Sequence, residues 1–268
     1  MSTEIKMKIA VMSTGRSRCT LLAKYLHTLH NDLEFCGEFY NALLDLEGNP
    51  VEPGFYGDAV QKPNYMRNPA ELTEELFAKE NYIVKIMGLD SRCQDISVFR
   101  LEEYDELHFI ERHDFFEQCC SWQVSRQEHL YHQRPDDPRA TEQAFAAIKR
   151  RRYRLTTEEI RQAALFAHWY LRLKRYVTDN NLPYTLHTFE SAKMFDKKQN
   201  LLTDTKLNYS ELILNYDLKE EVNTLFNKYF SYDTIHSDVT SFTDELNEIK
   251  GLRSMQSFAD KMAAKWNK

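Results

Sequence analysis

The sequence predicts an α/β protein in three layers, with a mainly parallel central sheet flanked by helices. Short apolar runs alternate along the chain with longer amphipathic segments, a pattern typical of strands joined by helical crossovers. The 268 residues are enough to bury one large hydrophobic core. We therefore predict a single domain over residues 1–268, with a core over about 7–195 and a helical C-terminal part over about 205–268 packed on that core.

The first half of the chain predicts two strands and two helices. The apolar run 8–13 indicates a buried strand, and residues 20–30 place leucines on one helical face. Asn68 followed by Pro69 is typical of a capped helix start, so a helix is expected to run to about residue 79. The apolar run 82–87 predicts the second clear strand, and the Pro- and Gly-rich stretch 46–68 predicts a loop.

The second half predicts two more strands and a larger share of helix. After a strand at 107–111, Asp114 and Glu117 have the spacing of a capping box, which indicates a helix to about residue 130. Further helices are expected at 141–151, 157–178 and over much of 210–230, with a strand at 184–189. An apolar helical stripe in the tail 252–266 is expected to dock on the same domain, with partner binding as the alternative.

Composition excludes several classes of protein. The seven glycines form no G-x-G-x-x-G, and none precedes Lys-Ser or Lys-Thr, so the dinucleotide fingerprint and the Walker A loop are absent. A net charge of −6 gives no overall footprint for nucleic acid. Five cysteines without C-x-x-C argue for a reducing compartment, and the apolar run 9–12 is too short to span a membrane. We expect a cytoplasmic protein that does not bind nucleic acid and has no membrane span.

The loop between the first strand and the first helix is a candidate anion site. A helix that begins directly after a buried strand presents free backbone N–H groups and the positive end of its dipole. Ser17, Thr20 and the charge of Arg16 add to this potential. A plain strand–helix connection with a Thr cap is the alternative reading.

This segment resembles the 5′-phosphosulfate loop of sulfotransferases, which typically reads R-S-G-[ST]-T-L-L. Arg16, Ser17, Thr20, Leu21 and Leu22 match, whereas Arg18 and Cys19 replace the usual Gly and Ser or Thr. The resemblance implies a P-loop-like fold and a sulfuryl donor, PAPS (3′-phosphoadenosine 5′-phosphosulfate), whose product is adenosine 3′,5′-bisphosphate. It also implies that the loop holds the 5′-phosphate, with these cofactor-binding residues: Gly15, Arg16, Ser17, Arg18, Cys19 and Thr20.

A second match lies downstream. Arg112 follows the strand 107–111, and Ser121 comes nine residues later in the predicted helix. The pattern R-x-D-x-x-x-Q-x-x-S is similar to that of bacterial sulfotransferases of the trehalose-modifying type, in which the Arg and the Ser contact the 3′-phosphate. Physically, an Arg at the end of a strand can pair bidentately with phosphate and a Ser hydroxyl can donate to it. A surface Arg and an ordinary helix Ser are the alternative.

Besides Arg16, three residues are candidates for the chemistry. Lys85 resembles the Lys that the family carries on a central strand, and with Arg16 it would stabilise the bridging and sulfuryl oxygens. Many relatives place a basic His two residues later, but Met87 stands here. Glu38, in Gly37-Glu38-x-x-Asn41, resembles the proposed base of the trehalose-type branch, and His113 is the second candidate. Exposed or structural roles remain open for each of them.

The resemblance implies a sulfotransferase that moves a sulfuryl group from PAPS to a hydroxyl of a carbohydrate or small-metabolite acceptor. An ATP-dependent P-loop-like kinase and a non-catalytic binding protein on the same fold are the alternatives. The His27/His30 and His129/His132 pairs have no third ligand at metal spacing, so no metal is expected. The basic run 149–154 is either a solvated helix end or a rim that attracts an acidic acceptor.

Overall fold

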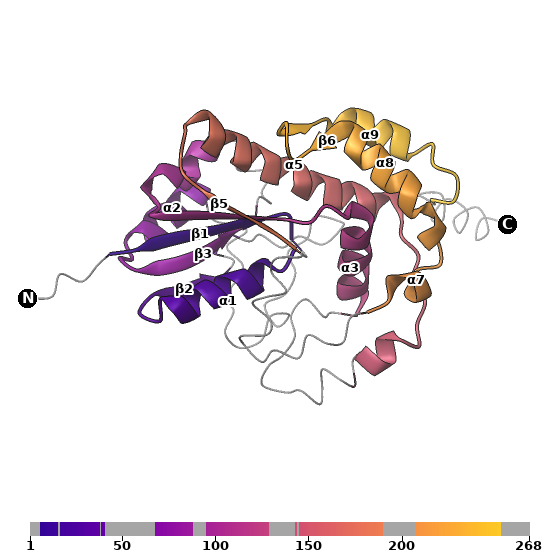
Figure 1. Ribbon diagram of the computed structural model, residues 1–268, viewed down its shortest axis with the longest axis horizontal. Coiled ribbons are helices and arrows are strands. Elements are labelled where there is room, and N and C mark those ends of the chain that lie inside the picture. Colours follow the sequence, from indigo (N-terminus) through magenta and orange to yellow (C-terminus); the bar gives the residue numbers. More distant parts are fainter. Residues whose placement is uncertain are drawn as a thin grey trace, which may run out of the picture. The chain divides into compact units, whose positions relative to one another are not determined.

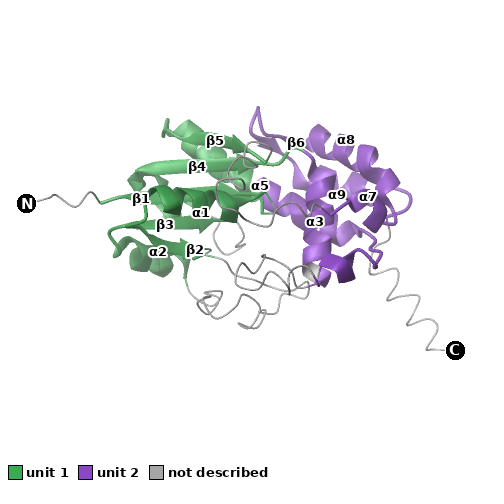
Figure 2. Cartoon of the chain, turned by 60° about the horizontal axis from the view of Figure 1, so that its bottom comes forward, with its two compact units in different colours: residues 1–113, 169–201 green, residues 114–168, 202–268 purple. Residues whose placement is uncertain are grey.

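The computed structural model describes residues 6–15, 17–37, 39–40, 68–87, 95–128, 143, 145–189 and 207–252. The chain divides into two compact units, coloured separately in Figure 2. Unit 1 contains residues 1–113 and 169–201, and unit 2 contains residues 114–168 and 202–268. The helices expected over 205–268 therefore group with residues 114–168, and the single domain with a core at 7–195 stays a prediction.

Unit 1 is built on a five-stranded sheet in which every pairing is parallel (Figure 1). β1 is the central strand of the sheet. Its residue Ile9 pairs with Ile83 of β3 on one side and with Glu106 of β4 on the other side. The α/β fold class predicted from the sequence is confirmed. In spatial order the strands are β2 (Glu34–Gly37), β3 (Tyr82–Ile86), β1 (Lys8–Ser13), β4 (Glu106–Glu111) and β5 (Thr185–Thr188).

Helices cover both faces of this sheet because successive strand residues point to opposite sides. α1 (Cys19–Leu29) buries Leu22 and Leu26 in one cluster with Ile9, Val11 and Ile83. Each such side chain contributes about 1.5–3 kcal/mol when fully buried. Figure 1 shows α1 on one side of the sheet and α2 (Pro69–Phe77) on the other.

The second face is covered by α2 and by the C-terminal half of α5. α5 extends over Thr157–Asp179, and its residues from 169 onward belong to unit 1. The rings of Phe77 and Tyr82 lie 6.2 Å apart edge to face, and those of Phe109 and Tyr170 lie 5.5 Å apart. Helix, sheet and helix thus form the three layers expected. Two short 3-10 helices precede β4: η2 (Ile96–Phe99) and η3 (Leu101–Glu103).

At the amino end of the sheet, the ring of Phe77 contacts two positively charged side chains. Lys8 Nζ and Arg100 Cζ each lie 4.3 Å from the centroid of its ring. Arg100 has φ +50° and donates from Nη2 to Glu103 Oε2 at 2.6 Å, while Nη1 reaches Glu74 Oε1 at 3.3 Å. We call Phe77, Lys8 and Arg100 the Phe77 cluster; it joins α2 to the starts of β1 and η3.

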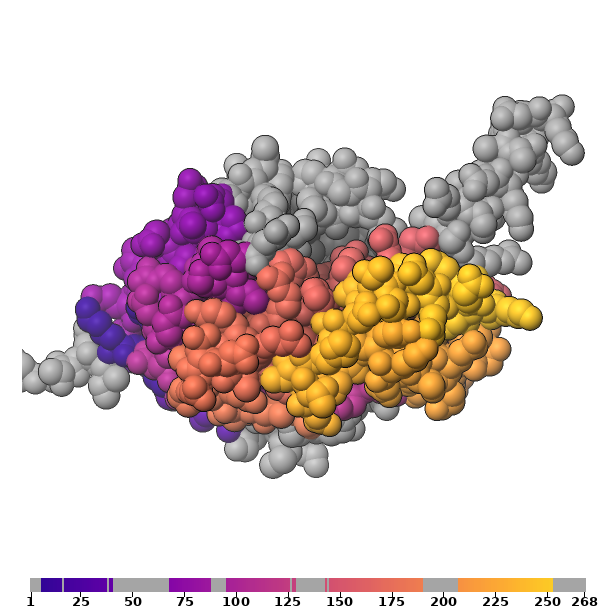
Figure 3. Space-filling model, turned by 90° about the horizontal axis from the view of Figure 1, so that it is seen from above, coloured from indigo at the N-terminus to yellow at the C-terminus, as the bar shows by residue number. Residues whose placement is uncertain are grey.

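Unit 2 is helical and has its own aromatic core. The rings of Phe115 and Phe226 stack at 3.8 Å, and Phe226 stacks on Phe230 at 4.5 Å. α8 and α9 pack side by side and form a continuous surface in Figure 3. Besides the first half of α5, the unit contains α3 (Phe115–Gln127), α7 (Tyr209–Leu212), η4 (Tyr216–Leu218), α8 (Lys219–Tyr229), β6 (Phe230–Ser231), β7 (His236–Ser237) and α9 (Val239–Leu246).

The sequence signal for the start of α2 is confirmed. The Asn68 side chain accepts from the N–H of Ala70 at 3.0 Å and caps α2. Residues 143 and 145–148 are helical within the expected helix 141–151. The tail stripe 252–266 lies almost wholly outside the described residues. Within the part of the chain described, no helix is long and apolar enough to cross a membrane.

Candidate anion-binding site at the carboxyl end of the sheet

The order of the strands marks one place in unit 1 where ligands are expected. From β1 the chain moves to β2 on one side, and from β3 it returns across β1 to β4 on the other side. In open parallel sheets, the crevice at the carboxyl ends of the strands beside such a reversal is the usual binding position. The β1–α1 loop, the end of β3 and the end of β4 meet this criterion.

Two residues of the β1–α1 loop, Gly15 and Arg18, have a left-handed backbone conformation. Gly15 has φ +73° and donates its N–H to Ser13 Oγ at 3.2 Å. Arg18 has φ +68° and is the N-cap residue of α1, where its side chain forms no capping hydrogen bond. Thr20 lies inside the helix, so the Thr cap expected in the alternative reading is wrong, whereas the plain strand–helix connection stays open as the alternative to an anion site.

Arg18 takes a backbone conformation that favours glycine. A non-glycine residue in the left-handed region costs about 1–2 kcal/mol. The resembled family has Gly at this position, and Arg18 follows the path that Gly would take without strain. The substitution therefore keeps the left-handed turn and adds a guanidinium group, and strain of this kind is concentrated at functional sites.

The loop has polar groups that are buried rather than solvated. Ser17 is fully buried, and its Oγ has no hydrogen-bond partner among the described residues. Lys85 is also buried, and its Nζ donates to Thr20 Oγ1 at 2.8 Å. A buried ammonium group beside the first turn of α1 places positive charge next to the loop. A buried hydroxyl without a partner is costly, and an oxygen of a bound anion would satisfy it.

Met87 packs against the apolar cluster beneath α1, on the same face of β3 as Ile83. A side chain two residues after Lys85 therefore supplies no base here.

Arg112 and Arg18 meet on a single aromatic ring. Arg112, directly after β4, is 5% exposed, and its Cζ lies 4.2 Å from the centroid of Phe189. Arg18 Cζ lies 4.5 Å from the same centroid. The N–H of Phe189 donates to the carbonyl of Glu111 at 2.7 Å, which fixes the ring at the carboxyl end of β5. We call Phe189, Arg18 and Arg112 the Phe189 cluster.

The neighbours of Arg112 on the other face of β4 have a structural role. Glu111 Oε1 accepts from Lys174 Nζ at 2.7 Å and from Tyr170 Oη at 3.0 Å, and all three side chains are buried. His113 Nε2 lies 3.7 Å from Glu111 Oε2, but the His113 side chain is 57% exposed. This buried ion pair ties β4 to α5.

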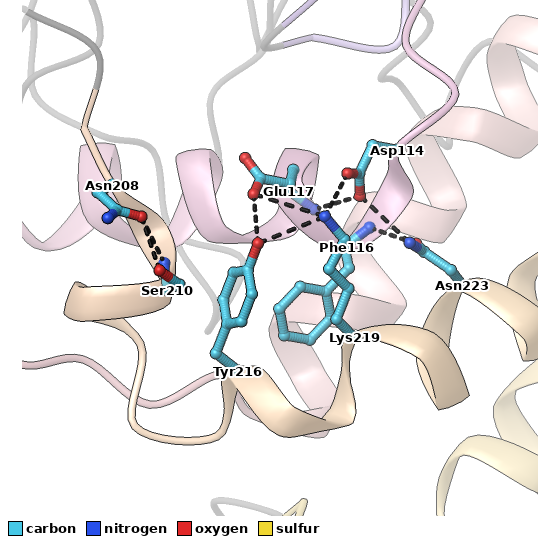
Figure 4. Close-up of polar contacts among 8 residues, drawn as sticks. All are labelled: Asp114, Phe116, Glu117, Asn208, Ser210, Tyr216, Lys219 and Asn223. Atoms are coloured by element: carbon cyan, nitrogen blue, oxygen red, sulfur yellow. Dashed lines mark hydrogen bonds and ion pairs between the residues drawn. The ribbon is translucent and has the colours of Figure 1, made fainter.

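Asp114 and Ser121, which complete the downstream motif, belong to unit 2. Asp114 Oδ1 accepts from the N–H of Glu117 at 3.1 Å and from Asn223 Nδ2 at 3.2 Å, as Figure 4 shows. Its other oxygen pairs with Lys219 Nζ at 2.7 Å. Burial raises the pKa of Asp114, but the hydrogen bonds from Lys219, Glu117 and Asn223 outweigh it and leave the pKa lowered. The predicted capping role is confirmed, and this Asp anchors α3 to α8.

Four further residues that the sequence assigned to the site are Ser121, Cys19, Arg16 and Glu38. Ser121 is buried in α3, and its contact with phosphate stays a prediction. Cys19 is the first residue of α1 and is buried. Arg16 and Glu38 lie outside the described residues. Beside Glu38, Gly37 ends β2 with φ +59°, and Phe39 and Tyr40 are buried.

No family model matches the sequence, and no curated protein matches it significantly. Among the residues that the structure describes, no group of three or more His, Cys, Asp or Glu side chains could hold a metal ion.

Phe189 is the functional candidate that sequence reasoning missed. It ends the segment 184–189, which predicted a strand, and nothing in that pattern shows which side chains contact its ring. Both arginines are distant from it in sequence, and the parallel pairings of β4 with β1 and with β5 bring the three together.

Proposed function

We propose that the protein is a sulfotransferase that binds PAPS and transfers its sulfuryl group to a hydroxyl of a carbohydrate or small-metabolite acceptor. The observation that carries this proposal is the gathering of Lys85, Arg18 and Arg112 around the β1–α1 loop of a protein whose net charge is −6. Their position at the strand-order reversal is where a nucleotide is expected. The matched loop and strand-end motifs narrow the ligand to PAPS.

The chain's residues fit an anionic nucleotide in two places. At the loop, the start of α1 and the buried Ser17 hydroxyl offer donors for a 5′-phosphate. At the end of β4, Arg112 offers a guanidinium group for a 3′-phosphate, with Ser121 as the second donor that the motif implies. PAPS, when bound, supplies the activated sulfuryl group.

The proposed chemistry is positioning and charge stabilisation, as for other loose in-line transfers. Lys85, held by Thr20, and Arg16 would stabilise negative charge on the bridging and sulfuryl oxygens. Glu38 would accept the proton of the acceptor hydroxyl. Because Met87 has no basic group, the base has to come from another segment, and the chain after β2 is the one the resemblance favours.

Two alternative functions make different predictions. A kinase would bind ATP with Mg²⁺ more tightly than adenosine 3′,5′-bisphosphate, and the absence of Gly-Lys-Ser or Gly-Lys-Thr argues against it. A non-catalytic protein would bind the bisphosphate without turnover. Its support is that Arg18 and Cys19 stand where the resembled family has other residues, and the left-handed backbone of Arg18 weakens the first of these two arguments.

Calorimetric titration with adenosine 3′,5′-bisphosphate, AMP and ATP tests the cofactor. We expect the bisphosphate to bind most tightly, because it is the only one of the three nucleotides with a 3′-phosphate as well as a 5′-phosphate. Arg112→Ala should remove a charge-assisted pair of about 1.5–3 kcal/mol, which is a loss of about 10- to 100-fold in affinity for the bisphosphate. Arg100→Ala, at the opposite end of the sheet, is the matched control and should bind like the wild type. Equal wild-type affinity for AMP and the bisphosphate would contradict the proposal.

Turnover with PAPS and a panel of sugars and small alcohols tests the base. Glu38→Gln keeps the shape and removes the basicity, so nucleotide affinity should be unchanged while turnover falls by about 10²-fold. If Glu38→Gln retains normal turnover and His113→Ala loses it, the base is His113.

A further inference from the structure

The basic run 149–154 lies in unit 2 and has no role in the proposed function. The helix before it ends at residue 148, and the run itself is fixed by pairing with the end of α7. The N–H of Tyr153 donates to the carbonyl of Leu212 at 2.8 Å, and the carbonyl of Tyr153 accepts from the N–H of Leu214 at 2.7 Å. The backbone of this run is therefore held on both sides of one buried tyrosine.

Four cations of the run are not neutralised by a carboxylate. Arg151 contacts both carboxylate oxygens of Glu128 at 2.7 Å, but Arg152 and Arg154 donate to backbone carbonyls, which carry no net charge. Among the described residues, no ion pair involves any of the other four cations, and all four are exposed. We call these four side chains the basic strip: Lys149, Arg150, Arg152 and Arg154.

An exposed leucine adjoins the basic strip. The Leu214 side chain is 57% exposed, and its backbone is bonded to Tyr153, which lies between Arg152 and Arg154 in the chain. An apolar side chain and several cations thus share one part of the surface. A lipid surface satisfies both, because anionic headgroups attract the cations and the boundary of the hydrocarbon region accepts the leucine. An acidic peptide or a nucleic acid would account for the cations but not for the leucine.

The C-terminal tail begins beside the basic strip. Arg154 Nη1 donates to the carbonyl of Gly251 at 3.3 Å, and the described residues end at 252. The sequence 253–268 contains four Lys or Arg and one Asp, and Trp266 continues the apolar stripe of the tail. A basic amphipathic pattern with aromatic residues among its apolar positions is typical of segments that lie on anionic membranes. The tail therefore favours the same kind of partner as the strip.

We propose that the basic strip and Leu214 form a surface that binds anionic lipid membranes, so that the protein lies on a membrane without crossing it. The strip supplies attraction to the headgroups, and Leu214 supplies a short apolar contact. Because such attraction is screened within a Debye length, binding depends on anionic lipid and decreases with salt. The proposal is independent of the proposed function, since none of these residues belongs to the site in unit 1.

Sedimentation of the full chain with vesicles tests this surface. Vesicles of phosphatidylcholine alone are compared with vesicles that also contain phosphatidylserine, at low and at high salt. We expect the wild type to prefer the phosphatidylserine vesicles, and to bind them more strongly at low salt. Lys149→Gln/Arg150→Gln should weaken this binding by about 10- to 30-fold, since each cation near an anionic surface contributes about fivefold. Leu214→Gln should weaken it by about three- to tenfold.

Matched control variants change exposed side chains outside this surface. Lys6→Gln/Lys228→Gln removes the same charge from two side chains that are 65% and 55% exposed. Leu29→Gln changes a leucine that is as exposed as Leu214. Both controls should bind vesicles like the wild type. Thermal unfolding checks that every variant is folded, as expected for substitutions at exposed positions.

The outcomes distinguish this surface from its alternatives. Loss of binding in the strip and Leu214 variants, but not in the controls, supports the proposal. Equal binding to both kinds of vesicle, or to neither, overturns it. Binding to polyglutamate or to a single-stranded oligonucleotide, without binding to phosphatidylserine vesicles, shows that the partner is another polyanion. If a chain that ends at Leu252 loses all binding while the strip variants bind like the wild type, the tail is the anchor and the strip is not.

Discussion

The Phe189 cluster and the Phe77 cluster are alike in composition and lie at opposite ends of the same sheet. Each consists of one phenylalanine ring with two cations over it, at 4.2 to 4.5 Å from the centroid. Each also contains an arginine with positive φ: Arg18 at +68° and Arg100 at +50°. Two cations on a ring and a strained arginine therefore do not by themselves indicate a binding site.

What distinguishes the two clusters is position in the topology. Arg100 separates η2 from η3, and its charge is paired with Glu103 and Glu74, so its strain has a local structural reason. Arg18 is the N-cap residue of α1, at the carboxyl end of β1. There the helix dipole favours an anion, and the reversal of strand order marks the usual position of a ligand. The comparison predicts that variants in the Phe77 cluster change stability and that variants in the Phe189 cluster change ligand affinity.

The largest effect on stability is expected beside the Phe189 cluster but on the opposite face of β4. Glu111→Gln removes the carboxylate that faces the Lys174 ammonium, and both side chains are nearly fully buried. Loss of one partner of a buried pair costs about 3–5 kcal/mol. Urea unfolding should show this decrease. The double variant Glu111→Leu/Lys174→Met should recover most of it, and a double variant as unstable as the single one would contradict the interpretation.

A smaller effect is expected from Phe77→Leu. The ring contacts Tyr82 and Tyr104 edge to face as well as the two cations. Loss of these aromatic and cation–π contacts should lower the free energy of unfolding by about 2 kcal/mol. Thermal unfolding measures the change. Phe189→Leu serves as its counterpart, and a larger loss of stability there than in Phe77→Leu would reverse the assignment of the two clusters.

Acid provides a test that leaves the arginines of both clusters untouched, because their charge does not change between pH 4 and 7. On the β4–β5 edge, burial and then the charge of His108 lower the pKa of His187 to about 4. An unfolded His, with a pKa near about 6.5, binds a proton more readily, so stability should fall as the pH drops from about 6.5 to 4. His187→Gln should show a shallower fall in Tm over this range. Parallel profiles for the two proteins would exclude His187 as the cause.

The smallest effect is expected from Glu103→Gln in the Phe77 cluster. The hydrogen bond from Arg100 lowers the pKa of Glu103, so this contribution is present above about pH 4.5 and is lost as the pH falls through the lowered pKa. Both side chains are partly exposed, which limits the pair to about 0.5 kcal/mol. Urea unfolding at low and high salt should show the difference only at low salt.

The sequence predicted the regular parts of this fold because their signals are local. The apolar run 8–13 coincides with β1, and the Asn68 cap and the Asp114 capping residue lie where expected. The short strand β2 and helix α9 have too few residues for a clear period, and they are held by tertiary packing.

The candidate site was predictable only in part, for a physical reason. Lys85 beside Thr20 follows from a strand and a helix that the sequence indicates separately. The contact of Arg18 with Phe189 depends on the registers of β4 with β1 and with β5, and on a left-handed backbone at a non-glycine residue. Helical and strand periodicity carry no information about either.

The central position of β1 affects how the chain is made. Its neighbours are far away in sequence: Met7 bonds to Asn81, 74 residues later, and Lys8 to Asp105, 97 residues later. At about 5–20 residues per second, a ribosome needs about 5–20 s after β1 before β4 emerges. Until β3 emerges the apolar strand has two unpaired edges, and until β4 emerges it still has one, which is the condition that favours aggregation. A nascent chain stalled before residue 106 is therefore expected to need a chaperone, whereas one stalled after β4 can close both sides of its first strand.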